Sequence, residues 1–386
     1  MSFLLATRAK TRSGPGVATA RPAAAARTVG AEGAEGAELG TESPAELPAE
    51  LAGRRRSPAT RWTWLGVALV ALVAAALASV TFGAREIAWS DLVAALRGHE
   101  ETVSQAAVAK RIPRTLLALL VGAALGVAGT VMQGVTRNPL ADPGILGVSS
   151  GASLAVVSGI AFFGLASPTG YIWVAILGAG IAAVFVYVVG SLGRGGATPL
   201  KLALAGAATS AALTSLISAI LLPRIQVMDS FRFWQIGGVG GASLGKIVLV
   251  LPFLVVGTLL CLVMARGLNS LALGDELAAG LGERVMRTRI VAATGAVALC
   301  GAATAVAGPI GFVGLVVPHA CRLLVGPDHR WLLPFSAIVG AVLLTLADVV
   351  GRVVARPDEI DVGIVTALIG APVFIAIVRR QKARAL

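Results

Sequence analysis

Long apolar runs alternate with short polar clusters along most of the chain after residue 57. The runs are about 18–25 residues long, enough for a helix to cross the ~30 Å hydrocarbon layer of a membrane. This pattern predicts an all-α polytopic membrane protein with about ten transmembrane helices. The expected spans are Trp64–Phe82, Arg114–Gln133, Ile145–Phe163, Tyr171–Gly190, Leu200–Leu222, Leu244–Ala265, Ile290–Ala307, Ile310–Val325, Trp331–Val350 and Val362–Val378. At Gly308-Pro309 the seventh and eighth spans could also form one interrupted helix.

An even number of spans places both termini on the same side of the membrane. Lys and Arg are more frequent at the span ends on that side, and such an excess marks the cytoplasmic side. We therefore expect a multi-pass protein of the cell membrane with both termini cytoplasmic. Residues 1–56 are rich in Ala, Gly, Glu, Pro and Arg, which predicts a disordered cytoplasmic tail before a membrane domain at 57–386.

The composition supports the membrane class. Hydrophobic residues make up 56% of the chain and charged residues 13%, whereas a soluble domain is about a quarter charged. The net charge of +12 comes from residues that flank the spans, so lipid is an expected partner and nucleic acid is not. Three cysteines lie in or beside apolar segments without paired spacing, and no disulfide, metal site or cofactor is expected: Cys261, Cys300 and Cys321.

The segment Arg266–Arg289 is a polar island between two apolar runs. Three leucines recur within it at i, i+4 and i+8: Leu273, Leu277 and Leu281. This spacing predicts an apolar stripe on a short helix, with Gly274 before Asp275 as its start and Gly282 as its stop.

The polar face of this predicted helix is acidic, with Asp275, Glu276 and Glu283. Helices that lie on a membrane surface usually carry Lys and Arg there instead. The pattern leaves three interpretations open: a surface helix, a helix folded back on its own protein, and a docking site for a soluble partner.

Four arginines flank the outer ends of two spans: Arg111 and Arg114 near the second, and Arg352 and Arg356 after the ninth. They could pair with local acids such as Asp358 and Glu359. They could instead hold an extracytoplasmic partner with an acidic face. Exposed pairs contribute only about 0.2–1 kcal/mol each, so they would set register and association rate more than affinity.

Ionisable residues are scarce inside the expected spans. An ion-coupled transporter would be expected to show them. Only Asp348 is a clear candidate, and Arg352 lies at i+4 on the same helix face, which favours a structural ion pair. The sequence also has no phosphate-binding loop, so the chain cannot hydrolyse ATP by itself. These features favour a pore subunit driven by a separate motor. A secondary transporter working alone and a membrane scaffold are the alternatives.

Several motifs closely resemble the iron-chelate and vitamin B12 uptake permeases of ATP-binding-cassette importers. The resemblance covers about residues 60–380 in family order. The motifs are RIPRTLLALLVGAALGVAGTVMQGVTRNPLADPGILGVSSGA (111–152), FWQIGG (233–238), LNSLALGDELAAGLG (268–282), GPIGFVGLVVPHACRLLVGPDHRWLLP (308–334), ADVVGR (347–352) and VTALIGAPVF (365–374). One departure is Asp361, which stands where the family usually has proline and can still cap the last helix.

The resemblance implies a permease domain at 57–386, with ten helices and an inverted repeat of spans 2–5 and 7–10. It implies a second permease subunit (a homodimer or a paralogous heterodimer), two cytoplasmic ATP-binding subunits and an extracytoplasmic substrate-binding protein or lipoprotein. The chain itself would be no enzyme. The cargo would be a metal chelate, with a ferric siderophore favoured and cobalamin and haem as alternatives.

The resemblance also assigns roles to individual positions. Coupling to the ATPase, through segment 266–289, falls on Leu273, Gly274, Asp275, Glu276, Leu277, Leu281 and Gly282. Docking of the binding protein falls on Arg111, Arg114 and Arg352. A cytoplasmic gate falls on Asn138 and Leu140, where the sequence NPLADPG itself predicts a non-helical turn.

Overall fold

The structure is a computed structural model that describes residues 57–83, 90, 94, 97, 102–193 and 198–382. The predicted tail at 1–56 lies outside the described residues. The helices are α1 (Pro58–Thr81), α3 (Val103–Thr136), the 3₁₀ turn η1 (Pro143–Leu146), α4 (Val148–Phe163), α5 (Pro168–Ser191), α6 (Pro199–Leu221), α7 (Ile225–Ile236), α8 (Leu244–Val263), α9 (Ala265–Leu271), α10 (Asp275–Gly280), α11 (Val285–Ala307), α12 (Val313–Val325), α13 (His329–Val354) and α14 (Val362–Lys382).

Each of the ten predicted spans coincides with a helix, which confirms the all-α membrane fold. Seven helices of the described part are long and apolar enough to cross a membrane: α1, α3, α5, α6, α8, α11 and α13. Three shorter apolar helices cover the other predicted spans, namely α4, α12 and the Val362–Ala376 part of α14. The chain is interrupted at Gly308-Pro309, since α11 ends at Ala307 and α12 begins at Val313.

Local sequence signals fix where several helices begin. Ser57, Ser167 and Thr198 each cap a helix whose first position is proline. A cap side chain accepts a hydrogen bond from a free backbone N–H, and proline fits the first turn because it lacks that N–H. Thr102 and Gln105 form a reciprocal capping box that starts α3. Arg111 and Arg114 therefore lie inside a helix, although the predicted second span began only at Arg114.

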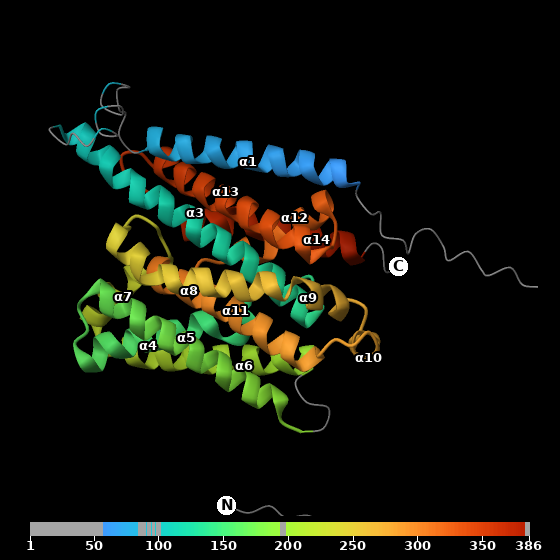
Figure 1. The fold of residues 1–386 in the computed structure, drawn as a ribbon. Helices are drawn as coiled ribbons and strands as arrows, with labels where there is room; N and C mark the ends of the chain where they lie inside the picture. The colour runs from blue at the N-terminus through green and yellow to red at the C-terminus, as the bar shows by residue number, and fades with distance from the viewer. Residues whose placement is uncertain are drawn as a thin grey trace, which may run out of the picture. The chain divides into compact units, whose positions relative to one another are not determined.

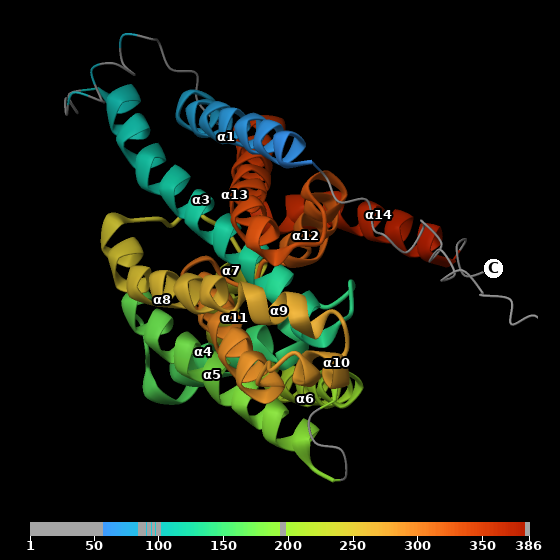
Figure 2. The ribbon, with the colours of Figure 1, turned by 45° about the vertical axis from the view of Figure 1, so that its right-hand side comes forward.

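Helix α3 is the central helix of residues 54–386. It runs between α13 on one side and α8 and α11 on the other (Figures 1 and 2), and it packs against all three. Its glycines allow very close approach. A Cβ added to Gly129 would lie 1.9 Å from the carbonyl oxygen of Gly314 on α12, and one on Gly122 would lie 2.3 Å from that of Gly340 on α13. Small residues at crossings are the usual way in which helices pack in lipid.

The helix bundle has two ends that carry different polar groups. The start of α1, the α9–α10 segment and the end of α14 lie at one end, here called the α10 end (Figure 1). The end of α1, the start of α3 and the α13–α14 connection lie at the opposite end, where Arg352 and Arg356 donate to backbone carbonyls of Phe82 and Gly83. The described chain thus begins with α1 and ends with α14 at the same end of the bundle.

Candidate functional site: an arginine-lined pocket and the α9–α10 segment

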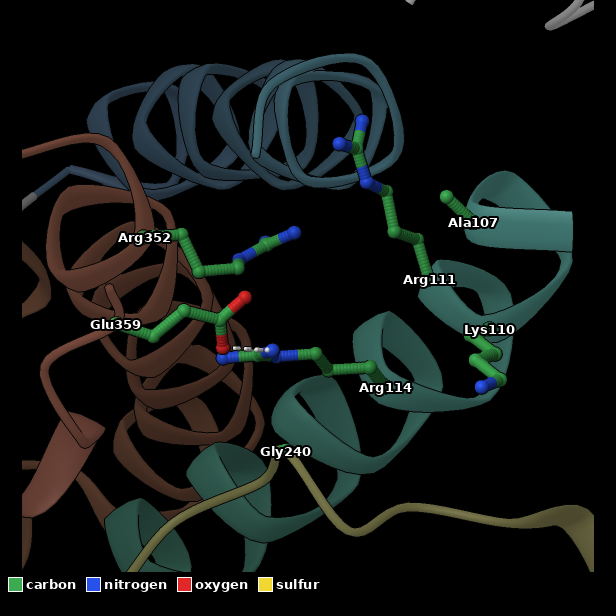
Figure 3. A pocket seen from close by; sticks show the side chains of 7 residues that line it. All are labelled: Ala107, Lys110, Arg111, Arg114, Gly240, Arg352 and Glu359. Atoms are coloured by element: carbon green, nitrogen blue, oxygen red, sulfur yellow. Dashed lines mark hydrogen bonds and ion pairs between the residues drawn. The ribbon is translucent and has the colours of Figure 1, made fainter. Parts of the chain in front are cut away.

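A pocket of about 510 Å³ opens at the end of the bundle opposite α10. It lies between α3, the end of α13 with the connection to α14, and the loop before α8 (Figure 3). The lining residues are Ala107, Lys110, Arg111, Arg114, Gly240, Arg352 and Glu359. Four of these are basic and one is acidic, so the pocket is positively charged and favours anionic groups.

Arg114 crosses the pocket from α3 and meets two carboxylates. Its Nε and Nη2 lie 2.9–3.2 Å from the oxygens of Asp348. Its Nη1 donates to Glu359 at 2.6 Å, the interaction drawn in Figure 3. Asp348 is buried, whereas the side chain of Glu359 is 41% exposed. Asp348 therefore holds Arg114 from the protein interior, whereas the outer partner of Arg114, Glu359, is partly exposed.

Arg352 is 1% exposed, and its guanidinium contacts α13 and α1 of its own chain. It forms an ion pair with Asp348 at 2.9 Å, which confirms the predicted i, i+4 pair. It also donates to Ser79 Oγ at 2.8 Å and to the Ser79 carbonyl at 3.0 Å, both on α1. These bonds tie α13 to α1, so Arg352 has a structural role within this chain.

Arg111 points toward α1 in Figure 3 and donates to the carbonyls of Val80 and Thr81 at 3.1 and 2.9 Å. Those carbonyls belong to the last turn of α1, where helical acceptors lack internal partners. Arg111 is 7% exposed. The structure thus brings the three predicted arginines to one pocket, with Arg111 and Arg352 turned into the protein.

Sequence reasoning missed Lys110 and the pocket role of Glu359. Ala107, Lys110, Arg111 and Arg114 follow the spacing i, i+3, i+4, i+7, which places them on one helix face. That signal was present in the sequence. The contact between Glu359 and Arg114 was not predictable, because the sequence identified Glu359 only as one of two acidic residues that could pair with the arginines.

The α9–α10 segment lies at the α10 end and exposes three leucines. Gly274 caps α10 with φ +107°, and Gly282 follows it with φ +83°, which confirms the predicted start and stop. The exposed fractions of Leu273, Leu277 and Leu281 are 57%, 63% and 69%. One detail of the prediction was wrong: α10 has only six residues, and Leu273 precedes its cap because Gly274 breaks the helix.

Asp275 fixes this segment to the rest of the α10 end. Its carboxylate forms 2.9 Å ion pairs with Arg137, which follows α3, and with Arg289 on α11. On the same side of α10, three residues further on, Ala278 is completely buried. Glu276 and Leu277 between them are exposed. The segment is therefore anchored on one face and free on the other.

The predicted turn after α3 is confirmed. Arg137 has the left-handed φ of +50°, and Asn138 Oδ1 accepts from the backbone N–H of Leu140 at 2.9 Å. Asp142 then caps η1 through Gly144, and burial raises the pKa of the Asp142 carboxyl although that hydrogen bond favours its ionised form. Asn138 is exposed and Leu140 half-buried. The Arg137–Asp275 pair places this turn beside the α9–α10 segment.

These observations define a class of protein. The bundle is a polytopic α-helical membrane protein with a basic pocket at one end and an anchored, leucine-exposing segment at the other. Among the described residues, no group of three or more His, Cys, Asp or Glu side chains could hold a metal ion.

The chain belongs to the FecCD transport family, whose model matches residues 71–380. It is 45% identical over 318 residues to the ferric enterobactin transport system permease protein FepD of Escherichia coli, covering 82% of this chain and 94% of that one. It is 40% identical over 326 residues to the siderophore transport system permease protein YfiZ of Bacillus subtilis, covering 84% and 98%.

A solved structure of a metal-chelate type ABC transporter in an inward-facing conformation has the same fold. Its TM-score is 0.72 at 30% identity, and the match covers 83% of this chain and 99% of that chain. The family consists of permease subunits of ABC importers. The chain is therefore a transport subunit and not an enzyme, and ATP hydrolysis belongs to a separate subunit.

Proposed function

We propose that this chain is the membrane subunit of an importer that moves a metal chelate, and in particular a ferric siderophore, into the cell. The observation that carries the proposal is the position of the basic pocket and the exposed leucines at opposite ends of one helix bundle. A subunit that receives cargo from one partner and is driven by another needs two such surfaces. The names of FepD and YfiZ favour an iron chelate over cobalamin or haem.

The basic pocket would receive the acidic face of an extracytoplasmic binding protein. Arg114 is the arginine suited to direct contact, because its outer partner Glu359 is partly exposed and can be exchanged for a carboxylate of that protein. Arg111 and Arg352 would act from within, by holding α1 against α3 and α13 and by adding positive potential. This division of roles accounts for their burial.

The exposed leucines at 273, 277 and 281 would insert into a cytoplasmic ATPase subunit. These three large apolar side chains are exposed within one short polar segment. On a water-facing surface, such a cluster commonly marks a site where another protein binds. The ion pairs of Asp275 would then carry movement of α10 to α11 and to the turn at Asn138 and Leu140. That turn would serve as the cytoplasmic gate. The α10 end, which holds the start of α1 and the end of α14, is accordingly cytoplasmic in this proposal, and both termini would lie on that side.

The complete importer would contain two permease subunits and two ATPase subunits beside the binding protein. The test is uptake of radio-iron siderophores, cobalamin and haem by cells that lack this chain. We expect loss of uptake of one ferric chelate, restored by the intact chain, and sensitivity of that uptake to vanadate. Loss of cobalamin or haem uptake alone would change the cargo. Uptake abolished by a protonophore while ATP is maintained would favour an ion-coupled transporter instead.

A further inference from the structure

A second cavity, of about 340 Å³, lies at the α10 end between the starts of α1 and α13 and the end of α12. It is remote from the basic pocket. Its lining residues are Arg61, Leu65, Val325, Arg330, Trp331, Pro334 and Phe335. Two cations and five apolar or aromatic side chains share one small cavity.

The charge of this cavity is only partly balanced. The Nε of Arg61 is buried and has no hydrogen-bond partner among the described residues. Nη1 of Arg61 forms a long ion pair with Oδ2 of Asp328 at 3.8 Å, which is beyond hydrogen-bond distance. The other oxygen of Asp328, Oδ1, accepts from Asn269 and from the backbone N–H of Arg330. The guanidinium of Arg61 also lies over the ring of Trp331, 5.8 Å from its centroid, but a ring supplies no hydrogen-bond acceptor oxygen. An anion with several oxygens would give the Arg61 guanidinium the acceptors that it lacks.

Apolar side chains form the remaining walls. Leu65 and Phe335 face the cavity from α1 and α13. Trp62, which is 61% exposed, stacks edge-to-face on Trp331 with ring centroids 5.1 Å apart. Tryptophans of this kind mark the level of the lipid headgroups.

We propose that this cavity binds an anionic phospholipid, with the phosphate between Arg61 and Arg330 and the first part of an acyl chain along Leu65 and Phe335. The two arginines select an anion, and the five apolar or aromatic side chains that line the rest of the cavity favour a lipid over a soluble anion. Arginine suits a phosphate because its planar fork can donate two hydrogen bonds. The bound lipid would bridge α1 and α13 and stabilise their contact, because a ligand of the folded state raises its stability.

The test uses the full-length protein, purified in a neutral detergent. Its melting temperature is measured with added phosphatidylglycerol, phosphatidylcholine or inorganic phosphate, and the retained lipid is counted by native mass spectrometry. We expect phosphatidylglycerol alone to raise the melting temperature and to remain bound. The double variant Arg61→Gln with Arg330→Gln should bind it roughly tenfold or more weakly, since two charge-assisted contacts are lost.

Two further variants keep the test decisive if the double variant unfolds. Arg330→Gln alone removes an exposed cation and should weaken retention while the fold persists. Arg287→Gln is the matched control, because Arg287 is exposed on α11 and does not line the cavity. Equal retention by all variants, or an equal shift with phosphatidylcholine, would overturn the proposal. An equal shift with inorganic phosphate would identify an adventitious anion site instead of a lipid site.

Discussion

The side-chain amide of Asn269 donates a 2.7 Å hydrogen bond to Oδ1 of Asp328 and thereby joins α9 to the start of α13. The carboxamide oxygen of Asn269 accepts from the backbone N–H of His329 at 2.9 Å. Helix α13 then runs across the bundle to Arg352 at the basic pocket. One residue therefore connects the exposed leucine segment to the helix that lines the opposite site.

Replacement of Asn269 should uncouple the two ends of the protein. In Asn269→Ala we expect the ATPase subunit to co-purify normally, because the leucines are untouched. Stimulation of ATP hydrolysis by the loaded binding protein should fall severalfold, and the loss of two or more hydrogen bonds should destabilise the fold by about 1–3 kcal/mol. Ser270→Ala is the control, since its hydroxyl bonds only within α9. Equal stimulation in both variants would exclude a coupling role for Asn269.

Leu277→Asp should prevent co-purification of the ATPase subunit while the protein still inserts in the membrane. The side chain is 63% exposed, so the charge disturbs no internal packing, but burying it in an apolar interface is unfavourable. Leu277→Met keeps the volume and polarity and should co-purify as the natural chain does. The measurement is the molar ratio of the two subunits after affinity purification. An unchanged ratio in Leu277→Asp would remove the docking assignment.

Glu359→Gln should strengthen capture of the binding protein. The carboxylate of Glu359 occupies the outer face of Arg114 at 2.6 Å, and a partner's carboxylate must compete with it. We expect a severalfold lower Kd, most evident at low salt, because screening weakens exposed charge pairs. Arg114→Glu should abolish the capture.

The neighbour Asp358 supplies the control for net charge, since Asp358→Asn makes the same change at another exposed position. Equal gains from Asp358→Asn and Glu359→Gln would mean that overall charge, and not release of Arg114, sets the affinity.

The membrane helices were predictable because the length and apolar content of a segment determine whether it can cross the membrane as a helix. Gly274, Gly282 and the proline-rich turn at 138–144 were predictable for a similar reason, since each acts through its own backbone. The start of α3 was missed because the helix extends through Lys110 and Arg111, which an apolar-length criterion excludes. The charge pairs depended on tertiary packing: Arg114 and Asp348 are 234 positions apart, so spacing could not choose between Asp348, Asp358 and Glu359.

Asp361→Asn should stabilise the protein at neutral pH. Burial raises the pKa of the Asp361 carboxyl, and Glu359 and Asp348 add to this effect while Arg114 opposes it. A raised pKa in the folded state means that ionisation opposes folding, so stability is lost as the pH rises through the range above the unfolded value of about 3.9. The melting temperature of Asp361→Asn should exceed that of the natural chain at pH 7, and the difference should vanish below about pH 4. A difference independent of pH would attribute the effect to packing.

Gly129→Ala should destabilise the fold, whereas Gly66→Ala should not. A Cβ at position 129 would lie 1.9 Å from the carbonyl oxygen of Gly314, and backbone cannot move aside as a side chain can. Overpacking of this kind typically destabilises by about 1–3 kcal/mol. Gly66 lies in α1 with no neighbouring atom within 4 Å of the added Cβ, and alanine is the better helix former by about 1 kcal/mol. Melting temperatures in detergent should therefore move in opposite directions. A Gly129→Ala protein as stable as the natural chain would show that α3 and α12 do not approach as closely as this packing requires.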